Sequence, residues 1–391
     1  MKADLHGAAG RIICLSVAVL TAAAAVCGCG KDSGAAAGGT QTGSRAEAPE
    51  TAGEAADPDE ILTREVFAMD TYMTFSAYGA EAPAALDEAE AEIKRLDALL
   101  SAESDASEIS KLNASGGGPV SEDTAVLIRR SLELFEKTDG AFEITVYPVK
   151  KAWGFADGNF RVPDEAELSE LLARVGSDRV HLSENGKEVR FDGEGTEIDL
   201  GGIAKGYASS RLADIYREHG VKGLINLGGN VQVFGAKPDG SDWRVGIRTP
   251  AGSDGEALPW LSKEASGSAA MAGIEYFGIL ETNDQAVITS GGYERYFEEN
   301  GGVYHHIIDP ATGYPADTDI LSATAVSRDG TLADGLSTSI FVLGREKASE
   351  LWRENSDSFD MIIMDTDGQV WATEGIRGQF TSELTIRWIE K

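Results

Sequence analysis

Residues 197–206 read Glu-Ile-Asp-Leu-Gly-Gly-Ile-Ala-Lys-Gly, and this stretch indicates how the centre of the chain is built. The start of the stretch predicts a short strand over 197–200, and the two glycines that follow let the backbone approach a ligand closely. A helix is expected from there to about His219, so that free N–H groups and Lys205 meet at an N-terminus that suits an anion. The alternative is a plain strand–turn–helix connection with a solvated lysine and Asp199 as an N-capping residue.

The elements on either side of this stretch mix helices and hairpins without a regular βαβ alternation, so the predicted class is α+β. Asn185-Gly186 predicts a type I′ hairpin within 179–192, and the polar, small-residue segment 253–273 predicts a long loop. Apolar spacing predicts helices over 84–100, 124–137, 331–343 and 347–354. Alternation and short apolar runs predict strands over 66–78, 224–227, 231–234, 243–247, 304–308 and 322–327.

The amino-acid composition and net charge argue against some classes of binding partner. The chain has 391 residues, 42% of them hydrophobic, and 34 Lys and Arg against 65 Asp and Glu give a formal net charge of −31. Nucleic acid is therefore not an expected partner, because phosphate neutralisation needs clustered basic residues. An acidic protein can still bind an anionic ligand when a divalent cation lies between the two. The sequence has no Walker A, GxGxxG, HExxH or GxSxG motif, which argues against P-loop, Rossmann, zincin and α/β-hydrolase chemistry.

The N-terminal residues predict an export signal. All three cysteines lie in the first thirty residues, so the rest of the chain has no disulfide or thiol chemistry. Residues 1–28 combine a basic start with an apolar run too short to span a bilayer comfortably, which predicts a lipoprotein signal peptide with Cys29 as the acylated residue. The alternative is an ordinary signal peptide or an uncleaved anchor. Residues 29–60 predict a flexible acidic tether, so 61–391 is expected to be a domain anchored outside the cytoplasmic membrane.

One segment near the C-terminus carries side chains suited to metal binding. In residues 331–338, Asp334 and Thr338 are four residues apart on one helix face, where both oxygens could reach one hard cation. The alternative is a capping box formed by Thr331 and Asp334, which needs no metal.

Another segment, 304–313, contains two consecutive histidines, His305 and His306. Side chains alternate along a strand, so only one imidazole can enter a site, and the other is expected to be solvated or packed. Two adjacent histidines without further His or Cys make a poor zinc site. One imidazole does suit a general base near neutral pH.

Together and in this order, the segments resemble the ApbE family, the FAD:protein FMN transferases. The resemblance covers about residues 61–391, and its strength lies in the order of the motifs, since each is weak alone. The matching segments are 68–71, 107–113, 140–148, 199–206, 227–230, 289–293, 306–313 and 332–338.

The resemblance implies a fold of two packed α/β halves with mixed, largely antiparallel sheets and a flavin site between them. It implies His306 as the base and Mg²⁺ held by Asp334, Thr338 and the Gly202 carbonyl, so that His306 and Asp334 are the expected catalytic residues. Many family members are lipoproteins, which agrees with acylation of Cys29. The residues expected to contact FAD are Met69, Ala141, Phe142, Glu143, Asp199, Lys205 and Ile308.

Two positions depart from the family pattern. Glu143 stands where Asp is usual, which lengthens the side chain by one methylene. Glu103 stands where some members carry an aromatic residue that stacks on the flavin.

The implied reaction attacks the FMN phosphorus of FAD with a threonine hydroxyl of a second protein and releases AMP. Expected acceptors carry an Asp-x-x-Ser-Ala/Gly-Thr-like motif, as on extracytoplasmic subunits of the Rnf and Nqr electron-transport complexes. Two alternatives stay open: an Mg²⁺-dependent FAD pyrophosphatase, in which water replaces threonine, and a non-catalytic, tethered flavin-binding lipoprotein. The Asp334–Thr338 pair with His306 argues against the second alternative, because flavin storage needs neither a metal nor a base.

Overall fold

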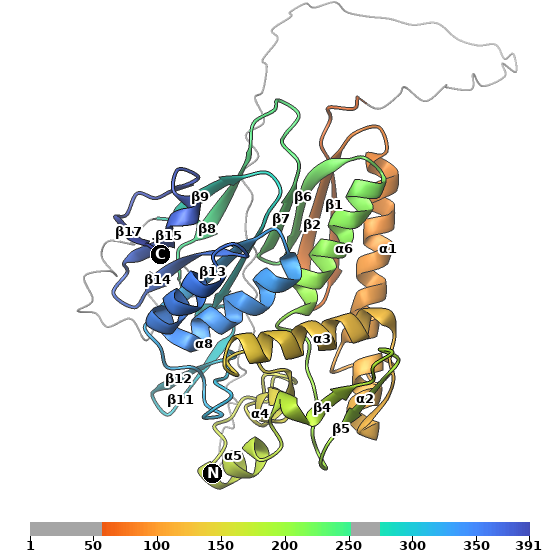
Figure 1. The fold of residues 1–391 in the computed structure, drawn as a ribbon, viewed down its shortest axis with the longest axis vertical. Coiled ribbons are helices and arrows are strands. Elements are labelled where there is room, and N and C mark those ends of the chain that lie inside the picture. The colour runs from red at the N-terminus through yellow and green to blue at the C-terminus, as the bar shows by residue number, and fades with distance from the viewer. Residues whose placement is uncertain (1–56, 252–273) are drawn as a thin grey trace, which may run out of the picture.

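A computed structural model describes residues 57–251 and 274–391 (Figure 1). The predicted signal peptide, Cys29, most of the tether and the predicted loop 253–273 lie outside the described residues, and those expectations stay predictions. Within the two described ranges, none of the helices combines the length and the apolar character that a membrane crossing needs.

One large sheet of nine strands organises the fold. Neighbouring strands are antiparallel throughout, except for the parallel last pair. Every residue of the interior strand β13 is buried, as expected for a strand covered on both faces. In spatial order the strands are β1 (Leu62–Ala68), β2 (Thr71–Tyr78), β6 (Lys222–Leu227), β7 (Asn230–Phe234), β10 (Ala286–Gly291), β13 (Ile320–Ser327), β14 (Asp360–Asp365), β15 (Val370–Thr373) and β17 (Ile386–Ile389).

Each face of this sheet is covered by a different kind of layer. Three helices, α1 (Ala82–Leu100), α6 (Ala204–Glu218) and α8 (Gly330–Asn355), pack on one face over the larger hydrophobic core (Figure 1). A three-stranded antiparallel sheet covers the other face and encloses a second core that includes Trp243, Phe277 and Phe380. Its strands are β8 (Trp243–Arg248), β9 (Tyr276–Thr282) and β16 (Phe380–Thr381).

A smaller α/β region lies at one end of the large sheet (Figure 1). A third hydrophobic cluster lies here around the fully buried Trp153. The Trp153 ring makes tilted contacts with Phe297 and Tyr304 of the neighbouring hairpin, β11 (Tyr296–Glu299) and β12 (Gly302–His305). The other elements of this end are α2 (Glu108–Ser115), β3 (Gly117–Pro119), α3 (Glu122–Lys137), η1 (Ile144–Val146), α4 (Tyr147–Ala152), α5 (Glu165–Leu172), η2 (Ser177–Arg179), β4 (Val180–Leu182) and β5 (Glu188–Phe191). Two short 3₁₀ helices, η3 (Gly292–Glu294) and η4 (Glu374–Ile376), join strands elsewhere.

The predicted α+β class with largely antiparallel sheets is confirmed. The predicted helices over 84–100 and 124–137 correspond to α1 and α3, and α6 ends at Glu218, one residue before the predicted end. The two predicted C-terminal helices are both found in α8, which is interrupted at Gly344 with φ 76° and ψ 163°. Strands were correctly predicted at β6, β7, β8 and β13.

The predicted strand over 66–78 is wrong, because the chain turns back in its middle. β1 and β2 form a hairpin whose last pair is Ala68 and Thr71, and the two residues between them, Met69 and Asp70, have φ values of 47° and 57°. Positive φ at both central positions is type I′ geometry, for which Asn-Gly or Asp-Gly is the usual signal. A Met-Asp pair carries no such signal, and the apolar alternation continues through it.

The predicted strand over 197–200 is also wrong. These residues pair with no strand; instead the Asn113 side chain accepts from the N–H of Ile198 at 2.8 Å and donates to its carbonyl at 2.9 Å. The Asp199 N–H donates to the Ile144 carbonyl at 2.8 Å. A side chain and one backbone contact thus satisfy groups that a sheet ladder would otherwise satisfy.

The predicted hairpin within 179–192 is confirmed as β4 and β5, but its turn is not type I′. Only Gly186 of the Asn185–Gly186 pair has a positive φ, 66°, and the connection is longer than two residues. The two-residue Asn-Gly turn of this fold lies at Asn300–Gly301, with φ values of 52° and 82°, and it joins β11 to β12.

Gly206 allows α6 and α8 to approach each other closely. A Cβ atom at this position would lie 2.2 Å from the Gly330 carbonyl oxygen and 2.4 Å from the Asp334 Cβ. Both are far inside van der Waals contact, so no residue with a side chain fits without moving one of the helices.

We therefore expect Gly206→Ala to lower the free energy of unfolding by about 3 kcal/mol, the upper end for overpacking a core. Urea unfolding followed by circular dichroism measures this. Ser210→Ala on the same helix is the matched control and should change the free energy by less than about 0.5 kcal/mol. Equal stability of the two variants would contradict the close packing of these helices.

Candidate active site

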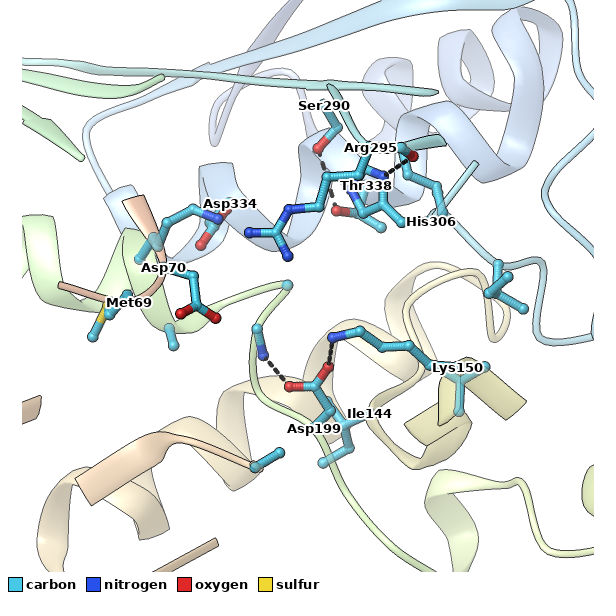
Figure 2. A pocket seen from close by; sticks show the side chains of 18 of the residues that line it. Met69, Asp70, Ile144, Lys150, Asp199, Ser290, Arg295, His306, Asp334 and Thr338 are labelled. Carbon is cyan, nitrogen blue, oxygen red and sulfur yellow. Dashed lines mark hydrogen bonds and ion pairs between the residues drawn. The ribbon is translucent and has the colours of Figure 1, made fainter. Parts of the chain in front are cut away.

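A cavity of about 280 Å³ lies where one end of the large sheet meets α4 and the segment before α6 (Figure 2). Its wall also includes the β1–β2 turn, the end of α1, the β6–β7 turn, η3, the segment after β12 and the N-terminal half of α8. All the described residues that the sequence assigned to the flavin, the metal or the base line this cavity. They are Met69, Ala141, Phe142, Glu143, Asp199, Gly202, Lys205, His306, Ile308, Asp334 and Thr338.

Asp334 is a buried carboxylate at the junction of three elements. Its oxygens accept from the Gly206 N–H of α6 at 2.7 Å and from the Asn230 side-chain amide at 2.9 Å. Burial raises the pKa of Asp334, while the Lys205 charge and these hydrogen bonds oppose the rise. The capping-box alternative is wrong, because α8 is capped by Asp329, whose side chain accepts from the Leu332 N–H at 3.0 Å.

The oxygen donors around Asp334 fit Mg²⁺. Thr338 lies one helical turn further on, with its hydroxyl 3.3 Å from that of Ser290, and Gly202 lines the same cavity. The described residues contain no group of three or more His, Cys, Asp and Glu side chains arranged to hold a metal. A cation here would depend on one carboxylate, neutral oxygens and water, which suits Mg²⁺ because it usually keeps several waters.

His306 presents one ring nitrogen to the cavity. The residue follows the end of β12, so the predicted strand over 304–308 is shorter than expected. The Arg295 carbonyl accepts from both the His306 N–H, at 3.1 Å, and its Nδ1, at 3.2 Å (Figure 2). Because a carbonyl only accepts, Nδ1 carries the hydrogen and Nε2 keeps its lone pair.

The environment also keeps this imidazole neutral. Burial lowers the pKa of His306 well below its usual value, and the positive charge of Arg295 lowers it further. A histidine that is neutral at pH 7 and has an unprotonated Nε2 is prepared to accept a proton.

His305 has a structural role, which confirms that only one of the two histidines enters the site. Its Nε2 donates to the Ala316 carbonyl at 3.1 Å, and its ring packs perpendicular to Phe341 with centroids 5.4 Å apart. Burial lowers the pKa of His305 to about 4.

Asp199 is paired with a lysine that the sequence analysis did not identify. Lys150 Nζ lies 2.6 Å from one carboxylate oxygen, and the Gly201 N–H donates to the other at 2.9 Å (Figure 2). Burial is the largest single influence on Asp199 and opposes its ionisation, but the charge and hydrogen bond of Lys150, the Gly201 N–H and the Lys205 charge together lower its pKa. The available signal was the Lys150-Lys151 pair in α4: Lys150 enters the cavity and Lys151 pairs with Glu197.

The carboxylate of Glu143 is already engaged within the protein. It accepts from the backbone and the hydroxyl of Thr145, both at 2.8 Å, and from those of Ser177 at 2.8 and 2.7 Å. Any contact of Glu143 with a ligand is therefore left to its other atoms. Glu103, the second departure from the family pattern, is exposed and lines the cavity. A carboxylate therefore stands at this position in place of an aromatic ring that could stack on a flavin.

The rim and the apolar wall are held from outside the cavity. Met69, in the strained left-handed turn, donates its N–H to Asp97 of α1 at 3.0 Å. Phe142 and Ile308 are buried in two different hydrophobic clusters. The wall is therefore fixed before any ligand binds, which limits the ordering cost of binding.

Two further charged residues were missed because the motif at 289–293 ends just before them. Glu294 lines the cavity, and burial raises its pKa to about 7. Arg295 extends its side chain into the cavity (Figure 2). In the part of the chain that the structure describes, the lining contains seven Asp and Glu and three Lys and Arg, a balance that favours an anionic ligand accompanied by a cation.

The ApbE family model matches residues 69–363 of this chain. The chain belongs to the ApbE family. This membership agrees with the motif order in the sequence and with the cavity that those motifs form.

Relatives named FAD:protein FMN transferase cover most of the chain. A FAD:protein FMN transferase of Treponema pallidum is 35% identical over 314 residues, which are 76% of this chain and 81% of that protein. One from Klebsiella pneumoniae is 36% identical over 269 residues, or 68% of this chain and 77% of that protein.

Solved structures share the fold. The ApbE protein of Thermotoga maritima matches with a TM-score of 0.72 at 29% identity, over 82% of this chain and 99% of that one. The flavin transferase ApbE of Vibrio cholerae matches with a TM-score of 0.69 at 26% identity, over 82% of this chain and 100% of that one.

The histidine environments are testable without any ligand. In an NMR titration, we expect His305 to titrate near pH 4 and His306 to stay neutral well below pH 6.5, with hydrogen on Nε2 and Nδ1 respectively. The unfolded chain protonates both near pH 6.5, so the free energy of unfolding should fall as the pH drops below that value. His305→Gln and His306→Gln assign the signals. A His306 pKa at or above 6.5, or hydrogen on its Nε2, would contradict this geometry.

Proposed function

We propose that this chain transfers FMN from FAD to a threonine hydroxyl of an acceptor protein and releases AMP. One observation carries the proposal: a neutral histidine with an available Nε2 shares one cavity with a buried carboxylate and hydroxyl suited to Mg²⁺. The relatives named FAD:protein FMN transferase support the same reaction.

In this reaction the acceptor hydroxyl oxygen attacks the phosphorus on the FMN side of the diphosphate. A new P–O bond to threonine forms, the bond to the bridging oxygen breaks, and AMP leaves with that oxygen. His306 Nε2 takes the hydroxyl proton, while the Arg295 carbonyl holds the ring in the required tautomer and orientation. General base catalysis of this kind contributes roughly 10²- to 10⁴-fold to a rate.

The cavity must also accommodate the negative diphosphate. Lys205 lies in the first turn of α6, close enough for its positive charge to oppose the rise in the pKa of Asp334 and of Glu294. Asp334, Thr338 and the Gly202 carbonyl would hold Mg²⁺. When bound, this ion supplies positive charge to the phosphate oxygens. The excess of acids in the lining predicts that FAD binds weakly without it.

The finer assignments of partner and location belong to this proposal. The acceptor is expected to carry an Asp-x-x-Ser-Ala/Gly-Thr-like motif, as on subunits of Rnf- or Nqr-type complexes. The protein is expected to act on the extracytoplasmic face of the membrane, anchored through Cys29, because residues 1–28 have the pattern of a lipoprotein signal peptide.

The purified full-length chain, FAD, Mg²⁺ and a candidate acceptor domain test the reaction directly. Flavin fluorescence on the acceptor after denaturing electrophoresis, with release of AMP, supports transfer. FMN and AMP without labelled acceptor would indicate the pyrophosphatase alternative, and intact bound FAD would indicate storage. Transfer that persists in excess EDTA would refute the metal assignment.

We expect His306→Gln to lower the rate of transfer by roughly 10²- to 10⁴-fold, because the proton acceptor is lost. Asp334→Ala should abolish Mg²⁺-dependent transfer, since the only carboxylate of the proposed donor set is removed. His181→Gln, an exposed histidine, is the control and should leave the rate unchanged. An unchanged rate in His306→Gln would remove the base assignment, and an unchanged rate in Asp334→Ala the metal assignment.

Cys29→Ser should release the protein from the membrane fraction, because no other cysteine follows the predicted cleavage site. Cell fractionation with labelled palmitate measures both location and acylation. Cys27→Ser is the matched control and should stay membrane-bound. Acylation that persists in Cys29→Ser would show that another residue carries the lipid.

A further inference from the structure

Arg295 lines the cavity and contacts the proposed base, His306, through its backbone. It follows η3 and reaches into the cavity, with its guanidinium in the space between the labelled side chains (Figure 2). Among residues 57–251 and 274–391, no hydrogen bond or ion pair joins this guanidinium to another side chain. A guanidinium has five N–H donors, and a half-buried one without acceptors is available for a ligand.

The other cations of the cavity differ in this respect. Lys150 is bonded to Asp199 at 2.6 Å, so its charge is largely neutralised within the protein. Lys205 presents a single point charge. Among the described residues that line the cavity, Arg295 is the only arginine. A planar guanidinium can bind two oxygens of one phosphate simultaneously.

The backbone of Arg295 links this guanidinium to the base. The same residue accepts from the His306 N–H and Nδ1 through its carbonyl, at 3.1 and 3.2 Å. In the proposed reaction, His306 must reach the hydroxyl that attacks phosphorus. Because the Arg295 backbone orients His306, the Arg295 side chain starts close to the same phosphoryl group. Base and guanidinium thus lie at the two ends of the β11–β12 hairpin, where the Arg295 carbonyl joins them directly.

We propose that Arg295 is a further catalytic residue, whose guanidinium binds the diphosphate oxygens of FAD at the phosphorus that is attacked. This inference rests on the proposed function for its substrate. The guanidinium donates N–H groups to the phosphoryl oxygens, which gain negative charge as the P–O bond to AMP breaks, and it exchanges no proton itself.

A purely structural role for Arg295 makes a different prediction. The contact with His306 uses the backbone carbonyl, which every substitution retains. If only that contact is important, a change of side chain leaves FAD binding and turnover as they are. Substitution of the side chain therefore separates the two roles.

The test uses the full-length chain with Mg²⁺ and compares FAD with riboflavin, which lacks phosphate. We expect Arg295→Gln to weaken FAD binding, measured by flavin fluorescence, by about 10- to 100-fold, the value of a charged hydrogen-bonding contact, and to leave riboflavin binding unchanged. The rate constant for AMP release should fall by roughly 10²- to 10³-fold, as when one preorganised donor is removed. Arg295→Lys keeps the positive charge but cannot bind two oxygens of one phosphate in the same way. Its FAD affinity and its rate constant for AMP release should lie between those of the wild type and Arg295→Gln.

The controls keep the inference separate from the proposed function. Arg244→Gln, an exposed arginine far along the chain, should match the wild type in every measurement, and the NMR tautomer of His306 should be unchanged in Arg295→Gln. Equal FAD affinity and equal rates in wild type and Arg295→Gln would overturn the inference while transfer itself stands. Wild type that binds FAD but transfers no FMN would refute the function, and the comparison of FAD with riboflavin would still decide whether Arg295 binds the diphosphate. An equal loss of FAD and riboflavin binding would also overturn it.

Discussion

The carboxylate of Asp334 is the contact on which the arrangement of the site depends. It receives the Gly206 N–H from α6 and the Asn230 amide from the start of β7, so one side chain joins two helices to the large sheet. Burying a carboxylate is costly unless its oxygens are satisfied, and here helix packing supplies the donors. The tight approach at Gly206 is therefore part of the site as well as part of the core.

Charge balance explains why the other side chains are distributed as they are. The lining is dominated by acids, and the Lys150–Asp199 pair satisfies two of its charges internally. Glu143 uses its carboxylate to fix η1 and Ser177. The other groups that face the cavity include a neutral base, several oxygen donors, two cations and acids such as Glu103 and Glu294. This composition favours an anion accompanied by a metal ion over the anion alone.

The sequence predicted the composition of the site better than its local geometry. His306, Asp334 and Thr338 could be found because each belongs to a motif, and motif order is visible without a fold. The Met69–Asp70 turn could not be found, since long-range contacts such as that with Asp97 hold residues in a conformation that their own preferences disfavour. Lys150 was missed because its partner Asp199 lies far away in the chain, and Arg295 was missed because it lies just outside the motif at 289–293.

The Asn300–Gly301 turn has a consequence for how this protein can change over evolution. Because this two-residue turn sets the pairing of β11 with β12, it also sets which of two consecutive imidazoles meets Phe341 and which meets the cavity. One inserted residue would shift the strand by one position and exchange their places. Substitutions in the hairpin are thus easier to accommodate than insertions or deletions. The length of the hairpin, more than its composition, determines which histidine faces the cavity.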